Sequence, residues 1–488
     1  MMTSPVGISG FAAYLPPYRV QLEDWCQWTG DSWAKISAVV GRSFRMRGPD
    51  ENAYTMAATA VVRLIEQYDI DPQCIGYLAL GTESSTDNSA GAVIIKGMVN
   101  DALQALGRPP MCRHCEVPEF KHACLGGVYA VKSAARYLAL DGAHRKAIVV
   151  CSDIAEYARG TSGEPTQGAG AVAMLIERDP KLLTLELQHS GSASDYRGAD
   201  FRKPFSRFAD QIVSGAGQIR DFPVFNGKYS TTCYLDEVLL AMDDMFAKMD
   251  ESRASVMQDA AAVFLHRPYL RMAEAGLGAS LLYALATDPA GQPLLAELAA
   301  TADIDVDALH LELTARPNLY DLIRTESLSE EVFPLTQSLL RTMREHPAFA
   351  QLISGKLRLG NEPMLHCGNL YTASLPIWMA AGLEQAVEEG LDLTGERLLT
   401  IGYGSGDAAE AIPLRVVPGW QDAARRISFA QVLSGAVDID RDSYEQLHDA
   451  GTLSQAAMTR PGVFVIDRVG ERSGQFDDSG IEYYRYQA

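Results

Sequence analysis

The sequence predicts a layered α/β fold. Short apolar runs that end in polar residues alternate with longer segments whose apolar residues recur at helical spacing. This alternation is typical of sheets covered by helices. The chain has 488 residues, 47% of them hydrophobic, and a mean hydropathy of −0.05. It is therefore long enough for two sizeable halves or one large layered domain, and we expect a soluble, folded protein.

The expected elements follow one another along the chain. Apolar runs predict strands over 6–15, 75–80, 146–152, 171–176, 261–266 and 398–406, with a further strand–loop unit over 364–371. Apolar periodicity predicts helices over 52–68, 92–106, 129–140 and 231–249. Residues 462–466 and 481–486 could form a terminal hairpin, and 189–230 indicate surface loops. Leu-rich helical signals from 279 to about 350 predict an inserted helical subdomain.

Charge and cysteine content exclude several classes of function. With 42 Lys and Arg against 62 Asp and Glu, the net charge is −20, which argues against a nucleic-acid partner. An anionic cofactor such as coenzyme A would need a local basic pocket. No segment predicts a membrane span or a signal peptide. Eight scattered cysteines indicate reduced thiols, and we expect a cytoplasmic location.

Cys124 lies just before Gly126, Gly127 and an Ala-rich helix. We expect the first-turn amides and the helix dipole to lower the pKa of its thiol. The two glycines should leave room for a substrate carbonyl beside backbone N–H groups. The alternative is an inert cysteine packed in the core.

Three further residues end apolar strands or lie in the loops that follow them: Glu83, His266 and Asn369. Cysteine, histidine and asparagine are the parts of a thiolate-based acyl-transfer site. A partly buried carboxylate adds the ability to remove a proton from the carbon beside an acyl carbonyl. Each also has a structural interpretation, as a solvated glutamate, a structural histidine and a turn asparagine.

Several sequence blocks, in a fixed order, join these residues. The blocks are 81–84, 123–124, 163–174, 222–230, 266–269, 368–375 and 403–406. In this order they resemble the 3-hydroxy-3-methylglutaryl-CoA (HMG-CoA) synthase family of the thiolase superfamily. The resemblance covers most of the chain outside about 279–350.

The resemblance implies a thiolase-like layered αβαβα fold of two similar halves, residues 1–178 and 179–488. It implies that acetyl-CoA acylates Cys124, that Glu83 deprotonates the acetyl methyl group, and that His266 holds acetoacetyl-CoA. Hydrolysis then releases the product. The other substrate-binding residues that it implies are Asn369, Ser405, Gly404, Tyr371, Thr166 and Arg271. It also implies acyl-CoA thioesters as substrates with no permanently bound cofactor, a homodimer, and a place in the mevalonate pathway of isoprenoid biosynthesis.

The chain departs from the family at three points. Leu125 stands where an aromatic residue is common, and Phe201-Arg202-Lys203-Pro204 is an interrupted form of an aromatic-Arg-Pro triplet. Arg271 takes the place of a lysine that binds the CoA phosphates, which keeps the charge and changes the geometry. The acceptor therefore stays open: it could be carried on CoA or on an acyl carrier protein, as in HMG-acyl-carrier-protein synthases.

Three alternatives remain beside this interpretation. Cys112, His114 and Cys115, with His122 and Cys124 nearby, could bind Zn²⁺, but no second paired ligand set follows, so we expect no metal. A ketoacyl synthase III-like enzyme would use the cysteine, histidine and asparagine without Glu83. A scaffold subunit of an acyltransferase complex would have no physical reason to keep the whole set.

Overall fold

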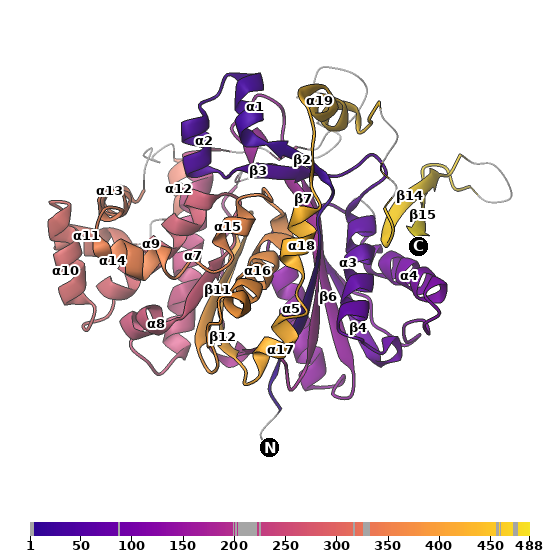
Figure 1. Ribbon diagram of the computed structural model, residues 1–488. Helices are drawn as coiled ribbons and strands as arrows, with labels where there is room; N and C mark the ends of the chain where they lie inside the picture. Colours follow the sequence, from indigo (N-terminus) through magenta and orange to yellow (C-terminus); the bar gives the residue numbers. More distant parts are fainter. Residues whose placement is uncertain are drawn as a thin grey trace.

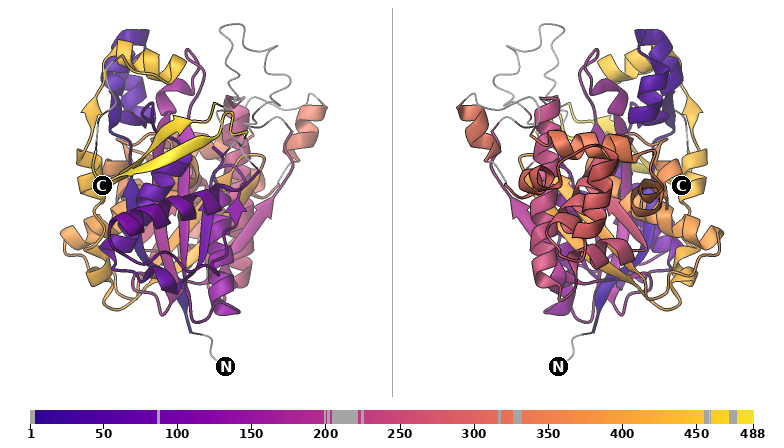
Figure 2. Two further views of the ribbon diagram at one scale, coloured as in Figure 1. Left: turned by 90° about the vertical axis from the view of Figure 1, so that its right-hand side faces the viewer. Right: turned by 90° about the vertical axis from the view of Figure 1, so that its left-hand side faces the viewer.

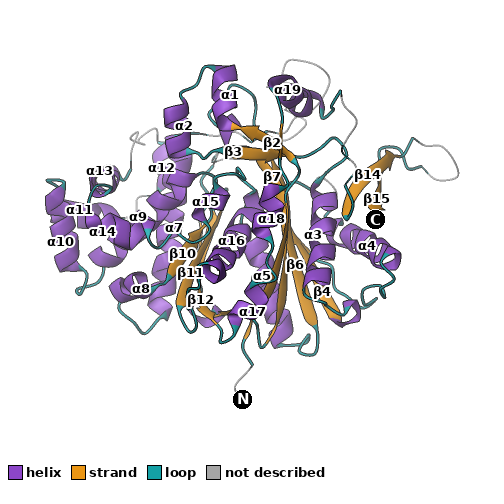
Figure 3. Ribbon diagram, in the orientation of Figure 1, coloured by secondary structure: helices purple, strands orange, loops and turns teal. Residues whose placement is uncertain are grey.

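The computed structural model places a ten-stranded mixed sheet at the centre of the protein, with helices packed against it (Figures 1 and 3). It describes residues 4–85, 88–198, 200, 203, 222–223, 226–315, 318–325, 332–454, 458, 460–471 and 477–488. The strand order is β10-β11-β12-β8-β1-β7-β6-β4-β5, and β9 pairs with β12. The sheet strands are β1 (Val6–Tyr14), β4 (Ile75–Gly81), β5 (Glu119–Phe120), β6 (Lys146–Ala155), β7 (Gly168–Arg178), β8 (Leu183–Leu185), β9 (Gly191–Ser194), β10 (Ala262–Leu265), β11 (Arg397–Gly404) and β12 (Ala408–Val416).

The same pairing pattern occurs at both ends of this sheet. In the first part of the chain, β4 runs parallel to β6, and β6 pairs antiparallel with β7. In the second part, β10 runs parallel to β11, and β11 pairs antiparallel with β12. Strand β8 joins the two parts, because it pairs with both β1 and β12. The strands predicted from apolar runs are confirmed, with the exception of 364–371.

Two buried helices occupy equivalent places in this pattern. Helix α5 (Gly126–Ala139) follows Cys124 and leads into β6, whereas α16 (Ser374–Glu388) follows Asn369 and leads into β11. Helix α5 packs against β4 and β6. On its other side, a Cβ atom at Gly402 of β11 would lie only 2.8 Å from the side chains of Leu125 and Val128. The start of α5 therefore lies between strands of both parts, where its alanines allow close packing.

The outer helices cover the sheet with apolar faces. Helix α3 (Ala53–Gln67) packs against β1, β6 and β7, and Asn52 begins it with a capping box. Helix α4 (Gly91–Ala105) packs on α3 and β4, and α7 (Lys228–Lys248) covers β9 and β12. These three helices and α5 confirm the four predicted from periodicity.

Residues 287–358 form only helices and turns where the structure describes them, and they gather on one side of the molecule (Figure 2). The helices of this region are α10 (Gln292–Thr301), α11 (Val306–Thr314), α12 (Leu319–Arg324), α13 (Pro334–Met343) and α14 (Pro347–Phe349), followed by the π-helical turn η4 (Ala350–Ser354). They pack against α9 (Leu270–Ala286). The helical character expected for 279–350 is confirmed.

The expectation of a strand over 364–371 is wrong. Helix α15 (Asn361–Met364) ends there, and the carbonyls of Leu365 and Cys367 accept hydrogen bonds from the backbone of β3 (Ser43–Met46) and its neighbour Arg42. Gly368 then adopts φ +74°, which turns the chain before a strand can continue. Much of 189–230 lies outside the described residues, although 191–194 form β9 rather than a loop.

The remaining elements lie around this core. The terminal hairpin is confirmed as β14 (Val463–Val469) paired antiparallel with β15 (Glu482–Gln487). The other elements are β2 (Tyr18–Gln21), β13 (Val437–Asp438), α1 (Leu22–Thr29), α2 (Trp33–Val39), α8 (Arg253–Asp259), α17 (Trp420–Ala424), α18 (Phe429–Ser434), α19 (Arg441–Ala450), and the short turns η1 (Pro72–Cys74), η2 (Glu164–Thr166), η3 (Leu187–His189) and η5 (Tyr371–Ala373). No helix in the described ranges has the length and apolarity needed to cross a bilayer.

Candidate active site

Five of the residues predicted for the site line one cavity of about 70 Å³. They come from different elements: the turn before α5, the loop after β10, the turn η2, the loop before η5 and the loop after β11. These residues are Cys124, His266, Thr166, Asn369 and Ser405. The fold therefore gathers the side chains that the sequence placed at the ends of its strands. Four other predicted residues do not line this cavity: Glu83, Gly404, Tyr371 and Arg271.

The Glu83 carboxylate lies against the predicted nucleophile. Its Oε2 atom is 4.0 Å from the Cys124 Sγ, within reach of the thiol proton. Burial raises the pKa of the Cys124 thiol well above its usual range, and the charges of Glu83 and Asp153 add to this. The expectation that the helix dipole lowers this pKa is therefore wrong. Helix α5 begins two residues later, and desolvation with two neighbouring carboxyl groups outweighs the dipole.

A strained turn holds Cys124 at the cavity. Ala123 adopts φ +42°, an unusual conformation for a residue with a side chain. The Leu125 amide donates to the His122 carbonyl at 3.0 Å, which closes the turn. The two following glycines serve protein packing rather than substrate access, because added Cβ atoms would meet the Phe120 carbonyl oxygen and the Cys151 sulfur. The room that we expected them to leave is filled by the protein itself.

Asp153 organises the loop that carries Glu83. One carboxylate oxygen accepts hydrogen bonds from the Glu83 amide (2.8 Å), the Ser84 hydroxyl (2.7 Å) and the Thr82 hydroxyl (2.9 Å). The other accepts from the amide (3.0 Å) and hydroxyl of Thr372, in the second part of the chain. Sequence reasoning missed this role, although Asp153 ends an apolar strand like the residues that it did single out.

Glu83 has the electrostatics of a buried acid. Burial raises its pKa to about 8, and the charge of Asp153 adds to this, whereas Lys203 and Lys121 oppose it. Near neutral pH the carboxyl group is mostly protonated, and the small ionised fraction is a strong base for a carboxylate. A raised carboxyl pKa beside a thiol is the property that proton transfer at an acyl group requires.

His266 faces the cavity as a neutral imidazole. Burial lowers its pKa to about 3, so the ring carries no charge at physiological pH. Its ring stacks on Tyr403 at a centroid distance of 6.4 Å, and its amide donates to the Ile401 carbonyl of β11. A neutral imidazole here can donate a hydrogen bond to a carbonyl oxygen without charging the pocket.

Hydrogen bonds with nearby residues fix the orientation of the Asn369 side chain. Its side-chain oxygen accepts from the Tyr371 amide (3.0 Å) and the Ser374 hydroxyl (3.3 Å), so its amide group points to the Tyr157 hydroxyl at 3.3 Å. Tyr371 adopts φ +45° and packs with Cys124 and Tyr157 in a small buried cluster. It thus supports the site from behind the cavity wall. Tyr157 and Tyr403 line the cavity, and sequence reasoning missed both.

Gly404 and Arg271 make structural contacts outside the first cavity. A Cβ atom at Gly404 would lie 2.5 Å from the His122 carbonyl oxygen. The absence of a side chain at this position therefore leaves room for the turn that holds Cys124. The Arg271 guanidinium donates to the Ala38 carbonyl (2.8 Å) and to Glu274 (2.6 Å). Its charge is therefore already paired within the protein.

A second, larger cavity adjoins the first. It measures about 830 Å³, and Ser162 lines both cavities. The rings of Trp25 and Trp28 lie in its wall, together with the cationic side chains of Lys35 and Arg159. The same wall also carries the acidic side chains of Asp31, Glu164 and Glu445, so the cavity joins aromatic surface to charges of both signs.

The comparisons with known proteins agree with this geometry. Residues 2–181 match the family model described as hydroxymethylglutaryl-coenzyme A synthase N terminal. The hydroxymethylglutaryl-CoA synthase of Haloferax volcanii is 29% identical over 402 residues, which cover 82% of this chain and 80% of the relative. The solved structure of MvaS in complex with 3-hydroxy-3-methylglutaryl coenzyme A is 26% identical, covers all of both chains and superposes with a TM-score of 0.76.

The fold and the site define a thiolase-like protein of the thioester-condensing class, with a half-buried glutamate beside a buried cysteine. The resemblance of the chain to the HMG-CoA synthase family, predicted from the ordered blocks, is confirmed. The Curacin pathway HMG synthase in complex with acetyl donor-ACP shares the fold, with a TM-score of 0.68 at 17% identity.

Proposed function

We propose that this protein condenses acetyl-CoA with acetoacetyl-CoA, or a related β-ketoacyl thioester, through an acetyl-Cys124 intermediate. The observation that carries the proposal is the 4.0 Å approach of Glu83 Oε2 to Cys124 Sγ beside a cavity that His266 and Asn369 line. A nucleophile alone would suffice for acyl transfer. A carboxyl group with a raised pKa beside it supplies the base that carbon–carbon bond formation needs.

The chemistry follows from the positions of these groups. The Cys124 thiol adds to the thioester carbonyl of acetyl-CoA, and its proton passes through Glu83 to the departing CoA thiolate. Glu83 then removes a proton from the acetyl methyl group, and the carbanion attacks the ketone carbon of the acceptor. The imidazole of His266 donates to that ketone oxygen while negative charge develops on it. Glu83 returns its proton to the new alkoxide, and water releases the product from Cys124.

Labelled acetyl-CoA tests this proposal. Incubation with acetyl-CoA alone should leave one label per chain on Cys124, and acetoacetyl-CoA should then convert the label to a six-carbon hydroxy acid thioester. Cys26→Ser, which changes a buried cysteine in α1, should still be labelled. An unlabelled Cys124 would refute the proposal. Turnover of malonyl thioesters instead would indicate a ketoacyl synthase III-like enzyme, and turnover only with a partner and Cys124→Ala would indicate a scaffold.

The second cavity is the place that we propose for the nucleotide end of CoA. The adenine could stack on Trp25 or Trp28, and Lys35 could meet the phosphates, whereas Arg159 is already paired with Glu445 and Asp449. Arg271, which we expected in this role, is bound by Glu274 and Ala38. Lys35→Ala should raise KM for acetyl-CoA several-fold with kcat unchanged, because the phosphates take no part in bond formation.

An acceptor on an acyl carrier protein is the second candidate. Because Arg271 is paired with Glu274, the phosphate contacts of a CoA-bound acceptor would have to come from another residue, such as Lys35. Comparing acetoacetyl-CoA with the same group on a carrier protein decides between them, since kcat/KM should be higher for the true carrier.

We further propose a division into residues 1–178 and 179–488, with the insertion near 279–350. Catalytic roles would then come from both halves, with Glu83 and Cys124 in the first and His266 and Asn369 in the second. We also propose a cytoplasmic homodimer that acts in the mevalonate pathway of isoprenoid biosynthesis. Light scattering of the purified protein tests the dimer, and rescue of a strain that lacks HMG-CoA synthase tests the pathway.

A further inference from the structure

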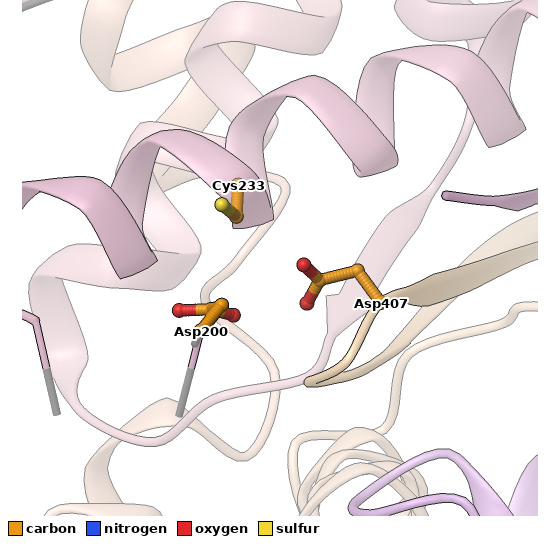
Figure 4. A group of neighbouring side chains, drawn as sticks. All are labelled: Asp200, Cys233 and Asp407. Carbon is orange, nitrogen blue, oxygen red and sulfur yellow. The ribbon is translucent and has the colours of Figure 1, made fainter. Parts of the chain in front are cut away.

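A second cluster of reactive side chains lies beyond the wall of the catalytic cavity. It joins Asp200, after β9, to Cys233 on α7 and to Asp407, just before β12 (Figure 4). One ligand-type atom from each lies within 4.8 Å of the other two. All three side chains are buried, with Asp200 1%, Cys233 0% and Asp407 2% exposed. In Figure 4 they converge on a common space.

Two carboxylate oxygens in this cluster have no hydrogen-bond partner. Tyr403 donates to Asp200 Oδ2 (3.1 Å) and Asp407 Oδ1 (2.5 Å), and the Gly406 amide also donates to Asp407 Oδ1. The other oxygens, Asp200 Oδ1 and Asp407 Oδ2, are buried and accept no hydrogen bond from any described residue. Buried carboxylate oxygens are costly unless something pairs with them.

The nearby arginine does not balance the charge. The Arg197 guanidinium binds Asp236 (2.7 Å) and Glu237 (2.6 Å), which are themselves buried. It reaches Asp407 only at 3.9 Å, between its Nε and Oδ2. Among the described residues, four buried carboxyl groups thus share one cation. Buried oxygens without a hydrogen-bond partner remain on all four groups: Asp200, Asp236, Glu237 and Asp407.

We infer that Asp200, Cys233 and Asp407 form a binding site for one zinc ion. Two carboxylates and a thiolate are ligands that Zn²⁺ accepts, and the sulfur favours it over Mg²⁺ or Ca²⁺. On binding, the Cys233 thiol releases its proton to solvent and the thiolate sulfur bonds the ion. This set is separate from Cys112 and Cys115, where the Cys112 sulfur instead accepts from Arg145 and the Cys115 thiol donates to a backbone carbonyl.

The ion would hold one wall of the catalytic cavity. Asp407 is fixed by paired backbone hydrogen bonds with Asp195 (both 3.1 Å), and Ser405 two residues earlier lines the cavity. Tyr403 donates to two of the three ligands and stacks on His266. The role of the zinc is therefore structural, in positioning this loop, and no step of the reaction passes through it.

Cobalt substitution tests the site on the full-length, untagged protein. After treatment with a chelator, titration with Co²⁺ should give one equivalent per chain with a near-ultraviolet thiolate-to-cobalt charge-transfer band, and Zn²⁺ should displace it and raise the melting temperature. Wild-type protein that binds no Co²⁺ and gains no stability from Zn²⁺ refutes the site. The two carboxyl groups would then share a proton instead.

Matched variants locate the ion. Cys233→Ser should abolish the charge-transfer band, and Asp407→Asn should weaken Co²⁺ binding at least tenfold. Cys115→Ser, which changes a buried cysteine in the other candidate set, should leave both properties unchanged. A band that survives in Cys233→Ser, or that disappears in Cys115→Ser, overturns the assignment. These readouts do not depend on acyl-CoA turnover, so they stand apart from the proposed function.

Discussion

Replacing Glu83 with glutamine should stabilise the protein while it removes condensation. The carboxyl group has a pKa of about 8 in the folded chain, against an ordinary value of 4.5. At pH 7 the unfolded chain therefore gains from ionising this group, and the folded chain does not. At about 1.4 kcal/mol per pH unit, the difference destabilises the fold by about 3 kcal/mol. Glutamine keeps the size of the side chain without this cost.

The gain in stability from Glu83→Gln should depend on pH. Because the folded-state pKa is raised, the stability that the neutral acid allows is fully present below about pH 4.5 and is lost as pH rises to about 8. The advantage of Glu83→Gln should therefore be near zero at pH 4.5, about 3 kcal/mol at pH 7, and constant at about 5 kcal/mol above about pH 9. Parallel urea unfolding of both proteins at these pH values measures it.

Activity should move in the opposite direction. Cys124 should still take the acetyl label, whereas condensation should fall by about 10²- to 10⁴-fold, the usual contribution of a general base. Glu388→Gln, an exposed position on α16, is the control and should change neither stability nor rate. A Glu83→Gln protein that is no more stable at pH 7, or whose gain is the same at pH 4.5, would refute the assigned environment of this carboxyl group.

Four further outcomes follow from the same geometry. Cys124→Ser should lose the acetyl label and all turnover, as mass spectrometry of the acetylated protein would show. His266→Gln should lower kcat/KM by at least tenfold, while the wild-type pH–rate profile should lack an inflection near 6.5, since burial lowers the pKa of His266 to about 3. Asp153→Asn should cost about 2 to 4 kcal/mol in urea unfolding, because the new amide would face the Thr372 donors. Gly404→Ala should reduce acetylation of Cys124 strongly, with circular dichroism unchanged, because its methyl group would press on the His122 carbonyl.

The local sequence pattern predicted where two of the candidate residues lie in the fold, whereas their proposed roles came from the resemblance. Glu83 and His266 follow apolar strands, and the structure places both at the ends of sheet strands, where side chains leave the core. The Ala-rich segment after Cys124 likewise forms the buried helix α5, because small residues allow strands to approach it from two sides. The spacing of apolar residues indicates which side of a segment is buried, and the predicted helices and strands rest on that spacing.

The environment of those residues could not be predicted in the same way. A helix start after Cys124 suggested a lowered pKa for its thiol, whereas burial raises that pKa and two carboxyl groups from distant segments add to the increase. The strand expected over 364–371 failed because Gly368 turns the chain, although its backbone does bond to the segment around β3. The first error concerns partners far away in sequence, which a local pattern does not contain. The second concerns the backbone conformation of a glycine inside the segment, which its apolar neighbours do not reveal.

Asp153 shows what joins the separate predictions into one site. Its two carboxylate oxygens bind the Glu83 loop on one side and Thr372, next to the Asn369 loop, on the other. A displacement of either part of the chain would break hydrogen bonds to a fully buried carboxylate, which is costly. The distance between the base and the nucleophile therefore depends on how the two parts pack. Burial is the main cause of the raised pKa of both Glu83 and Cys124, and the same Asp153 carboxylate adds to it, so the group that fixes the geometry of this site also strengthens its basicity.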